Sequence, residues 1–271
     1  MGSLLNPADG FAFTAEDFAS VRSRIFDMAG IRLSDQKDKM VYSRLSRRIR
    51  ELGLGDFSQY LRFLDSSRDE QVHFVNALTT NKTQFFRESH HFDFLAELAA
   101  GHSEPLRVWS AACSTGEEPY SIAAQLVALG REQDHILATD LNTQVLHTAE
   151  TGFYDINEAA NIPPGILKQT FLKGTGRHSG LMQPSRALRA RVSFRQLNLI
   201  GPWPFKQSFD VIFCRNVMIY FDKPTQNRLV TRFCQQLKPG GYLLLGHAEG
   251  LDKAQRDFVS IGKTIYQKVA G

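Results

Sequence analysis

The sequence has little of what would mark a secreted, metal-binding or membrane protein. Its three cysteines, Cys113, Cys214 and Cys234, are odd in number and widely spaced, which fits neither a disulfide framework nor a zinc site. We therefore expect reduced thiols and no bound metal. No apolar run reaches the roughly 20 residues that a membrane-spanning helix needs. The first residues, MGSLLNPADG, also lack the basic-then-apolar order of a signal peptide. These absences predict a cytoplasmic protein without membrane insertion.

What is present is the composition of an ordinary globular protein. Of the 271 residues, 42% are hydrophobic and 22% charged, which is enough for a real core. The formal net charge is +4 and the pI about 9.0, and this balance favours partners with acidic surfaces. The excess of positive charge is mild, so a nucleic-acid partner is allowed by it but not required.

The first eighty residues read as a small helical domain without a clear strand. Thr14 and Asp17 are spaced as a capping box, and apolar residues then recur at helical spacing until Gly30. A second helix is expected from Ser34 to Leu52. Two shorter helices are expected over 57–64 and 70–78. We predict a helical domain over residues 1–80, followed by a linker and cofactor lid over 81–104.

From Leu106 onward, expected strands alternate with expected helices, which predicts an α/β fold with a doubly wound parallel sheet over 105–271. A final return strand without a preceding helix would add an antiparallel edge, as is typical of methyltransferase sheets. The stretch at about 172–193 breaks this rhythm with several glycines. It is either a small antiparallel β insertion or a surface loop. The expected strands cover 106–110, 135–139, 192–196, 209–214, 242–245 and 264–269.

The loop after the first expected strand has the character of a nucleotide site. It reads Ala-Ala-Cys-Ser-Thr-Gly-Glu-Glu over 111–118, and its small residues allow a ligand to approach the backbone and the next helix N-terminus closely. Glu117 and Glu118 would repel a pyrophosphate but suit a ligand with positive charge, such as S-adenosylmethionine. The absence of G-x-G-x-x-G also disfavours a nicotinamide cofactor. Alternatively, both carboxylates only stabilise the helix dipole.

Asp140 ends the second expected strand of this domain, about 23 residues after the loop. That spacing is close to the ~20 residues expected of a carboxylate that binds ribose. The alternative role for Asp140 is an N-cap of the next helix, although Asn142 or Thr143 would serve there equally well. Loop and aspartate together indicate a nucleoside-type ligand without naming the methyl acceptor.

Three longer motifs then carry a resemblance to a known family. They are NKTQFFRE from Asn81, WSAACSTGEEPYS from Trp109 and FCRNVMIYFD from Phe213, and LKPGG and GHAE follow later in the chain. In this order they closely resemble the CheR family of chemotaxis receptor glutamate methyltransferases, over nearly the whole chain. The resemblance implies transfer of a methyl group from S-adenosylmethionine to receptor glutamate carboxylates, for sensory adaptation in bacteria.

The resemblance also implies roles for individual residues. Glu118 would contact the methionine part of the cofactor and Asp140 its ribose. Arg87 and Tyr220 would lie beside the transferable methyl group as the catalytic pair. The other implied cofactor-binding residues are Asn81 and Thr83 with Arg87 in the lid, Asn198 and Leu199 at the adenine, and Arg215 and Asn216 closing the pocket.

The chemistry of such a transfer needs no general base. A glutamate with a pKa near 4.3 is already ionised at neutral pH, so the enzyme must align the carboxylate and exclude water. We assign Arg87 to positioning, because a guanidinium offers paired donors to a carboxylate, and Tyr220 to aiming one oxygen. Outside the resemblance, Arg87 reads as a surface ion pair with Glu88, and Tyr220 as a core aromatic residue. We leave His90, His91 and His247 out of the site.

Substrate docking is assigned to an arginine stripe on the second expected helix. Arg44, Arg47 and Arg48 recur at helical spacing opposite the apolar face, and they would attract a carboxylate-rich helical receptor. A merely solvated helix face is the alternative. By resemblance, the β insertion would capture the receptor's C-terminal peptide tether by strand addition. We expect a monomer that does not bind nucleic acid. The rival functions are a nucleic-acid methyltransferase and a non-catalytic regulator.

Overall fold

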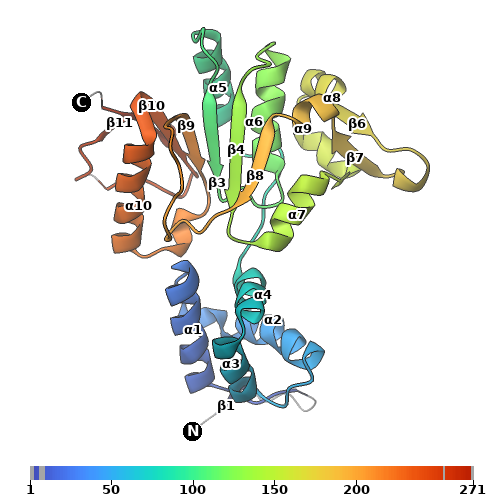
Figure 1. Cartoon of the computed structure of the whole chain (residues 1–271), viewed down its shortest axis with the longest axis vertical. Helices are drawn as coiled ribbons and strands as arrows, with labels where there is room; N and C mark the ends of the chain where they lie inside the picture. The colour runs from blue at the N-terminus through green and yellow to red at the C-terminus, as the bar shows by residue number, and fades with distance from the viewer. Residues whose placement is uncertain (1–2, 6–9, 253, 270–271) are drawn as a thin grey trace. The chain divides into compact units, whose positions relative to one another are not determined.

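The computed structural model describes residues 3–5, 10–252 and 254–269 (Figure 1). It divides into two compact units. The first comprises Met1–Thr80 together with Tyr220–Asp222, and the second comprises Asn81–Ile219 and Lys223–Gly271.

The helical unit begins with a helix whose ends are both set by local chemistry. In α1 (Ala15–Ala29), Thr14 accepts a hydrogen bond from the Asp17 N–H, and the Asp17 carboxylate accepts one from the Thr14 N–H. This is the predicted capping box. Gly30 ends the helix in the left-handed conformation, with φ of 70°, which costs glycine little because it has no Cβ.

The rest of the helical unit departs from the prediction in one respect. A short 3-10 turn, η1 (Asp35–Lys37), precedes α2 (Asp38–Glu51), and α3 (Phe57–Ser66) and α4 (Arg68–Leu78) follow. The expectation that this region has no strand is wrong, because β1 (Ser3–Leu5) and β2 (Phe13–Thr14) pair antiparallel. Segments this short cannot display the alternation by which a strand is recognised.

The second unit is built on a seven-stranded sheet in the order β11-β12-β10-β9-β3-β4-β8. The five strands from β10 to β8 are parallel, as predicted for a doubly wound sheet. Every residue of β9 is buried, in keeping with a central strand covered on both faces. The strands are β3 (Arg107–Ala111), β4 (His135–Asp140), β8 (Val192–Gln196), β9 (Phe209–Cys214), β10 (Leu237–Leu245), β11 (Phe258–Gly262) and β12 (Ile265–Lys268).

The return strand is antiparallel, but it is not the edge of the sheet. β12 lies between β10 and β11 and runs antiparallel to both. The edge is β11, which the sequence analysis missed. Three of its five residues are apolar, but only Phe258 is buried, and apolar and polar residues do not alternate along it as they do in a half-buried strand.

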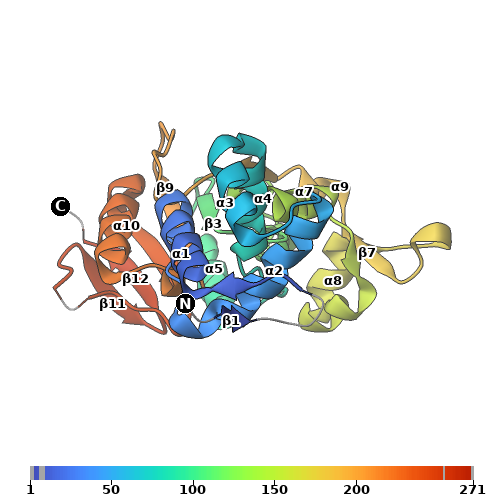
Figure 2. The same ribbon diagram turned by 90° about the horizontal axis from the view of Figure 1, so that it is seen from below.

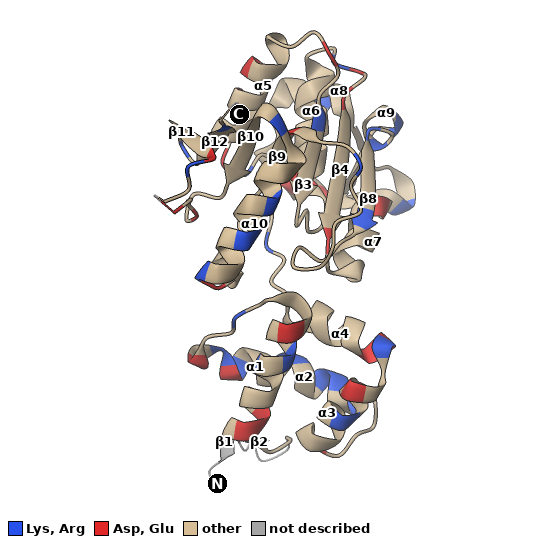
Figure 3. Ribbon diagram, turned by 60° about the vertical axis from the view of Figure 1, so that its left-hand side comes forward, with Lys and Arg blue, Asp and Glu red and all other residues tan. Residues whose placement is uncertain are grey.

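Helices cover both faces of this sheet. Val108 packs with α5 (His90–Ala100) and α6 (Glu117–Ala128) in one core cluster. The next residue, Trp109, points to the other face, where its ring contacts Phe233 of α10 (Lys223–Gln236). Figure 3 shows α10 on the near side of the strands.

A small antiparallel sheet joins the second unit at the end opposite β11 (Figure 2). Its order is β5-β7-β6, so the β insertion expected at about 172–193 does form. β5 (Tyr154–Asp155) and β6 (Phe171–Lys173) nevertheless begin before that range, while β7 (Leu181–Pro184) falls inside it. The shorter elements around it are η2 (Ile156–Asn161), α8 (Pro164–Thr170), η3 (Gly176–His178) and α9 (Arg186–Arg189).

Strand order fixes where a ligand can bind. From β3 the chain proceeds to β4 and β8 on one side, whereas β9 and β10 lie on the other. In open α/β sheets, ligands bind outside the carboxyl ends of the strands at such a reversal. The loops that follow β3, β4, β8, β9 and β10 therefore define the candidate site.

Candidate functional site

The loop after β3 is held in a conformation that few residues adopt. Ala112, Ser114 and Gly116 have φ of 64°, 51° and 98°. A Cβ on Gly116 would lie 2.8 Å from both the Ala149 Cβ and the Tyr154 hydroxyl, so glycine is required there. The loop is thereby packed closely against Ala149 and Tyr154, and the Cys113 N–H donates to the Thr139 carbonyl of β4 at 2.9 Å.

Asp140, the last residue of β4, fixes this loop from the side. Its carboxylate accepts hydrogen bonds from the backbone N–H of Ser114 at 2.8 Å and of Asn142 at 2.9 Å. The N-cap of α7 (Thr143–Thr151) is Asn142, which accepts from the Gln144 and Val145 N–H groups. Asp140 is thus not the cap of that helix. Burial raises the pKa of the Asp140 carboxyl despite these hydrogen bonds.

The two glutamates at the start of α6 have different surroundings. The Glu117 carboxylate accepts from the Thr115 hydroxyl. The Glu118 carboxylate accepts from the Ser110 hydroxyl at 2.7 Å and pairs with Arg215 at 3.0 Å. Burial raises the pKa of Glu118, and the Arg215 charge opposes that rise. Glu118 is the glutamate that belongs to a charged network at the end of the sheet.

Arg215, directly after β9, is the buried centre of that network. Its side chain is 2% exposed and lies between two carboxylates, with Glu118 on one side and Glu88 at 3.3 Å on the other. A second hydrogen bond runs from its guanidinium to the backbone carbonyl of Arg87. Arg215 thus ties the segment before α5 to the nucleotide loop.

Glu88 joins three loops at one carboxylate. Besides pairing with Arg215, it accepts from the His247 ring at 2.8 Å and from the Asn216 amide at 3.4 Å. Burial would raise the pKa of Glu88, but the His247 hydrogen bond and the Arg215 charge outweigh it and lower that pKa to about 2. The sequence analysis left Glu88 and His247 out of the site, although each lies in one of the motifs that carry the resemblance.

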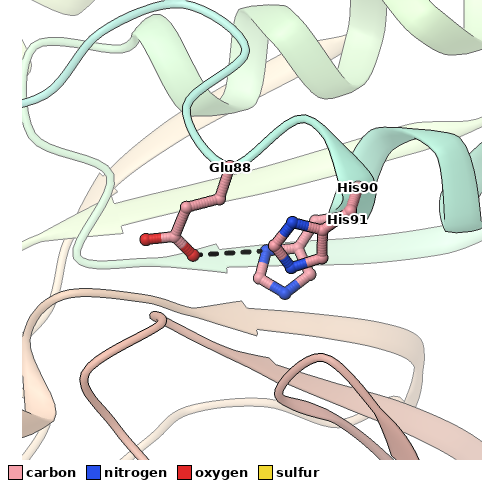
Figure 4. Close-up of side chains that lie close together, drawn as sticks. All are labelled: Glu88, His90 and His91. Atoms are coloured by element: carbon pink, nitrogen blue, oxygen red, sulfur yellow. Dashed lines mark ion pairs between the residues drawn. The ribbon is translucent and has the colours of Figure 1, made fainter.

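Glu88, His90 and His91 also form a group that could hold a metal ion (Figure 4). The His91 Nδ1 lies 3.7 Å from the Glu88 carboxylate, while its Nε2 faces the Lys263 carbonyl. Burial, aided by the Arg215 charge, lowers the pKa of His91 to about 3. Because the Arg215 guanidinium already supplies the positive charge beside Glu88, a metal ion would meet repulsion there.

Glu249 holds the loop after β9 through its backbone. Its carboxylate accepts from the N–H groups of Gly246 at 2.7 Å, Asn216 at 2.9 Å and Ile219 at 3.3 Å. A Cβ on Gly246 would lie 2.4 Å from the Asn216 side-chain nitrogen, so only glycine fits beside this turn. Arg215 and Asn216 are therefore presented on a rigid backbone.

The residues predicted for the lid lie in the segment before α5. The Asn81 carbonyl accepts from the Ser114 hydroxyl at 2.9 Å, which attaches this segment to the loop after β3. Thr83, two residues further along, is half-buried. Arg87 donates to the Lys82 carbonyl at 3.0 Å. The alternative of an ion pair between Arg87 and Glu88 does not hold, because Glu88 pairs with Arg215.

Two further predicted site residues follow β8. Asn198 accepts from the Ile200 N–H through its side chain at 3.1 Å and from the Gly201 N–H through its carbonyl at 3.0 Å. Leu199 is buried in the same turn. The preceding residue, Leu197, donates to the Asp140 carbonyl at 2.9 Å, which connects this turn to the end of β4. Tyr220 ends the turn η4 (Met218–Tyr220) and belongs to the first unit.

The expected arginine stripe on α2 is not free for docking as a whole. Arg44 donates to the carbonyls of Ala77 and Thr79 at the end of α4. Arg48 pairs at 2.7 Å with Glu70, whose side chain is 1% exposed. Arg47 alone keeps a largely exposed side chain, at 82%. Two of the three arginines therefore serve the folding of the helical unit, on which basic and acidic segments lie side by side (Figure 3).

The fold and the site together define a class of protein. A doubly wound sheet with an antiparallel strand next to its edge, a glycine-containing loop after β3 and an acidic residue ending β4 are typical of S-adenosylmethionine-dependent methyltransferases. Residues 81–267 match the family model described as CheR methyltransferase, SAM binding domain. Residues 16–79 match the model described as CheR methyltransferase, all-alpha domain. The chain therefore belongs to the CheR methyltransferase family and is an S-adenosylmethionine-dependent methyltransferase.

Curated relatives match along almost their entire length. Chemotaxis protein methyltransferase 2 of Pseudomonas aeruginosa is 49% identical over 94% of this chain and 94% of its own. The chemotaxis protein methyltransferase of Klebsiella aerogenes is 49% identical over 92% of this chain and 88% of its own. That of Escherichia coli is 45% identical over 97% of this chain and 94% of its own.

Proposed function

We propose that this chain methylates glutamate side chains on the cytoplasmic helical domain of chemotaxis receptors, and that it acts in the cytoplasm. The observation that carries the proposal is Arg215, a buried cation directly after β9 that lies between Glu88, before α5, and Glu118, at the start of α6. A methyltransferase with this family membership needs such a site for the charged methionine end of its cofactor. None of the described helices is both long and apolar enough to cross a membrane.

The residues present fit S-adenosylmethionine. Glu118 offers a buried carboxylate to an ammonium group, and Arg215 offers a guanidinium to a carboxylate. The Arg215 Nε is buried without a hydrogen-bond partner among the described residues, so it could donate to a polar ligand. Asp140 would accept from ribose hydroxyls, and Asn198 and Leu199 would hold the adenine. When bound, the cofactor supplies a methyl group on a positively charged sulfur.

The protein's own task is then to align the acceptor carboxylate. Because a glutamate carboxylate is already ionised at neutral pH, no residue has to remove a proton. Arg87 would position the carboxylate with paired N–H donors, and Tyr220 would aim one of its oxygens. Asn81 and Thr83 would help to close the lid and exclude water, which strengthens these polar contacts.

Recognition of the receptor would use two surfaces. Arg47, an exposed arginine of α2 that pairs with Glu51 at 3.0 Å, would attract acidic residues of a receptor helix, while Arg44 and Arg48 keep α2 in place. The receptor's C-terminal tether would add as a strand to β6, which forms one edge of the small sheet. Leu172 in that strand is 58% exposed and offers an apolar contact to such a peptide.

The activity is tested with tritiated S-adenosylmethionine and receptor-containing membranes. We expect label on receptor protein that base releases as methanol, because carboxyl methyl esters hydrolyse under base. Receptors whose methylation-site glutamates are changed to alanine should take up none. Absence of base-labile label, with S-adenosylhomocysteine still binding in calorimetry, would overturn the choice of acceptor and leave a cofactor-binding protein.

The catalytic pair and the tether need separate tests. Arg87→Ala should lower turnover at saturating cofactor, and unchanged turnover in that variant with loss in Tyr220→Phe would refute the positioning role of Arg87. For the tether, removing the receptor's C-terminal peptide should weaken binding to the enzyme. Equal binding of tailed and tailless receptors would refute strand addition at β6.

A further inference from the structure

The turn after β8 is held by two side chains, Arg232 of α10 and Trp203, which we call the clamp. The Arg232 guanidinium donates to the Leu199 carbonyl at 2.8 Å and to the Gly201 carbonyl at 2.5 Å. The sequence separation is more than thirty residues in both cases. The Arg232 side chain of α10 thus reaches the segment in which Asn198 and Leu199 lie.

Trp203 completes the clamp. The Arg232 guanidinium carbon lies 3.8 Å from the centre of the Trp203 ring, a stacked cation–π arrangement. The indole N–H of Trp203 also donates to the Leu199 carbonyl, at 3.1 Å. Trp203 packs in turn on Trp109 of β3 and on Phe233 of α10, with ring centres 4.9 and 5.1 Å apart. The clamp is therefore anchored to the central strand of the sheet.

The charge of Arg232 has no acidic counterpart in this arrangement. Among the described residues it forms no ion pair, and burial lowers the pKa of Arg232. Partial desolvation of an arginine without a carboxylate partner is unfavourable. Its cost is offset here by two carbonyls and an aromatic face, all of which belong to the segment 199–203.

The clamp fixes one peptide group at both ends. The Leu199 carbonyl oxygen is held by Arg232 and Trp203, and the N–H of the same peptide, on Ile200, donates to the Asn198 side chain at 3.1 Å. A peptide group is planar and does not rotate about its C–N bond, so its carbonyl oxygen and its N–H turn together. Holding its oxygen therefore also sets the direction of the N–H and, through it, the orientation of the Asn198 side chain.

We propose that Arg232 is a positioning residue that sets how the enzyme reads the adenine of its cofactor, acting through Leu199 and Asn198 rather than by touching the ligand. This inference rests on the proposed cofactor-binding role of the turn after β8. Loss of Arg232 would let the Leu199–Ile200 peptide rotate. The ligand would then lose affinity, and the site would lose its preference for adenine over a changed base.

Calorimetry with S-adenosylhomocysteine and S-inosylhomocysteine tests this, because the second ligand differs only in its base, in which the adenine amino group is replaced by a carbonyl oxygen and N1 carries a proton. Relative to the wild-type chain, Arg232→Met should bind S-adenosylhomocysteine about tenfold to a hundredfold more weakly. Its ratio of the two affinities should fall toward one. Arg232→Lys should recover part of both effects. Arg228→Met is the matched control, because Arg228 lies one turn earlier on α10 and its guanidinium donates to Thr225 on the same helix.

Trp203→Phe provides a second variant that keeps a smaller ring under Arg232 and removes the indole N–H. We expect it to weaken S-adenosylhomocysteine binding by about threefold and to lower the affinity ratio in the same direction. An Arg232→Met chain with unchanged affinity and ratio would overturn the inference. So would an equal loss for both ligands accompanied by a lower melting temperature, since that pattern means general destabilisation. Failure of the wild-type chain to bind S-adenosylhomocysteine would instead overturn the cofactor assignment itself.

Discussion

Replacing Glu88 by glutamine should cost the second unit stability in a way that depends on pH. The Glu88 side chain is 10% exposed, and its pKa is lowered from 4.5 to about 2. One pKa unit corresponds to about 1.4 kcal/mol, so the ionised carboxylate contributes about 3 kcal/mol to the free energy of unfolding. Because the folded pKa is the lower one, this contribution is complete above the unfolded pKa and is lost as the pH falls from 4.5 toward 2.

Tryptophan fluorescence during urea unfolding isolates this effect. The chain has two tryptophans, Trp109 and Trp203, and both belong to the second unit. The stability difference between wild type and Glu88→Gln should be about 3 kcal/mol at pH 7 and should fall to about half of that at pH 3. Glu97→Gln, an exposed position on α5, is the matched control and should change stability by less than about 0.5 kcal/mol.

Two results would contradict this reasoning. A stability difference below about 1 kcal/mol at pH 7 would mean that the network around Arg215 does not favour the ionised form of Glu88. A large difference that stays constant between pH 7 and pH 3 would mean that the glutamine disturbs packing instead of removing a charge.

Three other substitutions have defined outcomes. Glu70→Ala leaves Arg48 and the Tyr60 hydroxyl without their buried partner. The free energy of unfolding of the helical unit should therefore fall by about 3–5 kcal/mol, measured in denaturant by far-ultraviolet circular dichroism. A loss under about 1 kcal/mol would refute this role for the pair. Gly116→Ala places a methyl group 2.8 Å from two neighbouring atoms and should abolish detectable S-adenosylhomocysteine binding in calorimetry, whereas wild-type affinity would show that the loop shifts freely. Glu249→Gln removes a charge that accepts three backbone N–H groups and should lower the thermal midpoint, at a cost of about 2–4 kcal/mol; an unchanged midpoint would argue against this anchor.

Much of the fold was predictable because its signals are local. The capping box at Thr14, the helical spacing that ends at Gly30 and the apolar run of β9 all depend on neighbouring residues, and the structure confirms each. The Phe209–Cys214 strand was predicted at both ends because five of its six residues are apolar, with Asp210 as the exception, and all six are buried. By contrast, β5 contributes two residues to a sheet whose other strands lie further along the chain, and nothing in two residues marks such a partner.

The candidate site likewise has residues that the sequence could predict and residues that it could not. The nucleotide loop and Asp140 could be found because glycine and acidic residues follow strands at fixed spacing. Glu88 could not, since its partners Asn216 and His247 are 128 and 159 residues away in sequence. Arg44 and Arg48 were assigned to docking because helical spacing shows which face of α2 they occupy. It does not show that α4 offers carbonyls and a buried carboxylate to that face.

The backbone of the site also limits how the protein can be engineered. Seven non-glycine residues of the described chain have positive φ, and five of these, Phe86, Glu88, Ala112, Ser114 and Asn216, lie in the loops around Arg215. Left-handed conformations are unfavourable for residues with a side chain, so a selection for heat resistance should enrich glycine at Ala112, where only a methyl group is lost, but not at Phe86 or Glu88, whose side chains stabilise the fold. Such variants would gain melting temperature at the expense of a preformed ligand site, and thermostable libraries of this enzyme should therefore be screened for cofactor affinity from the first round.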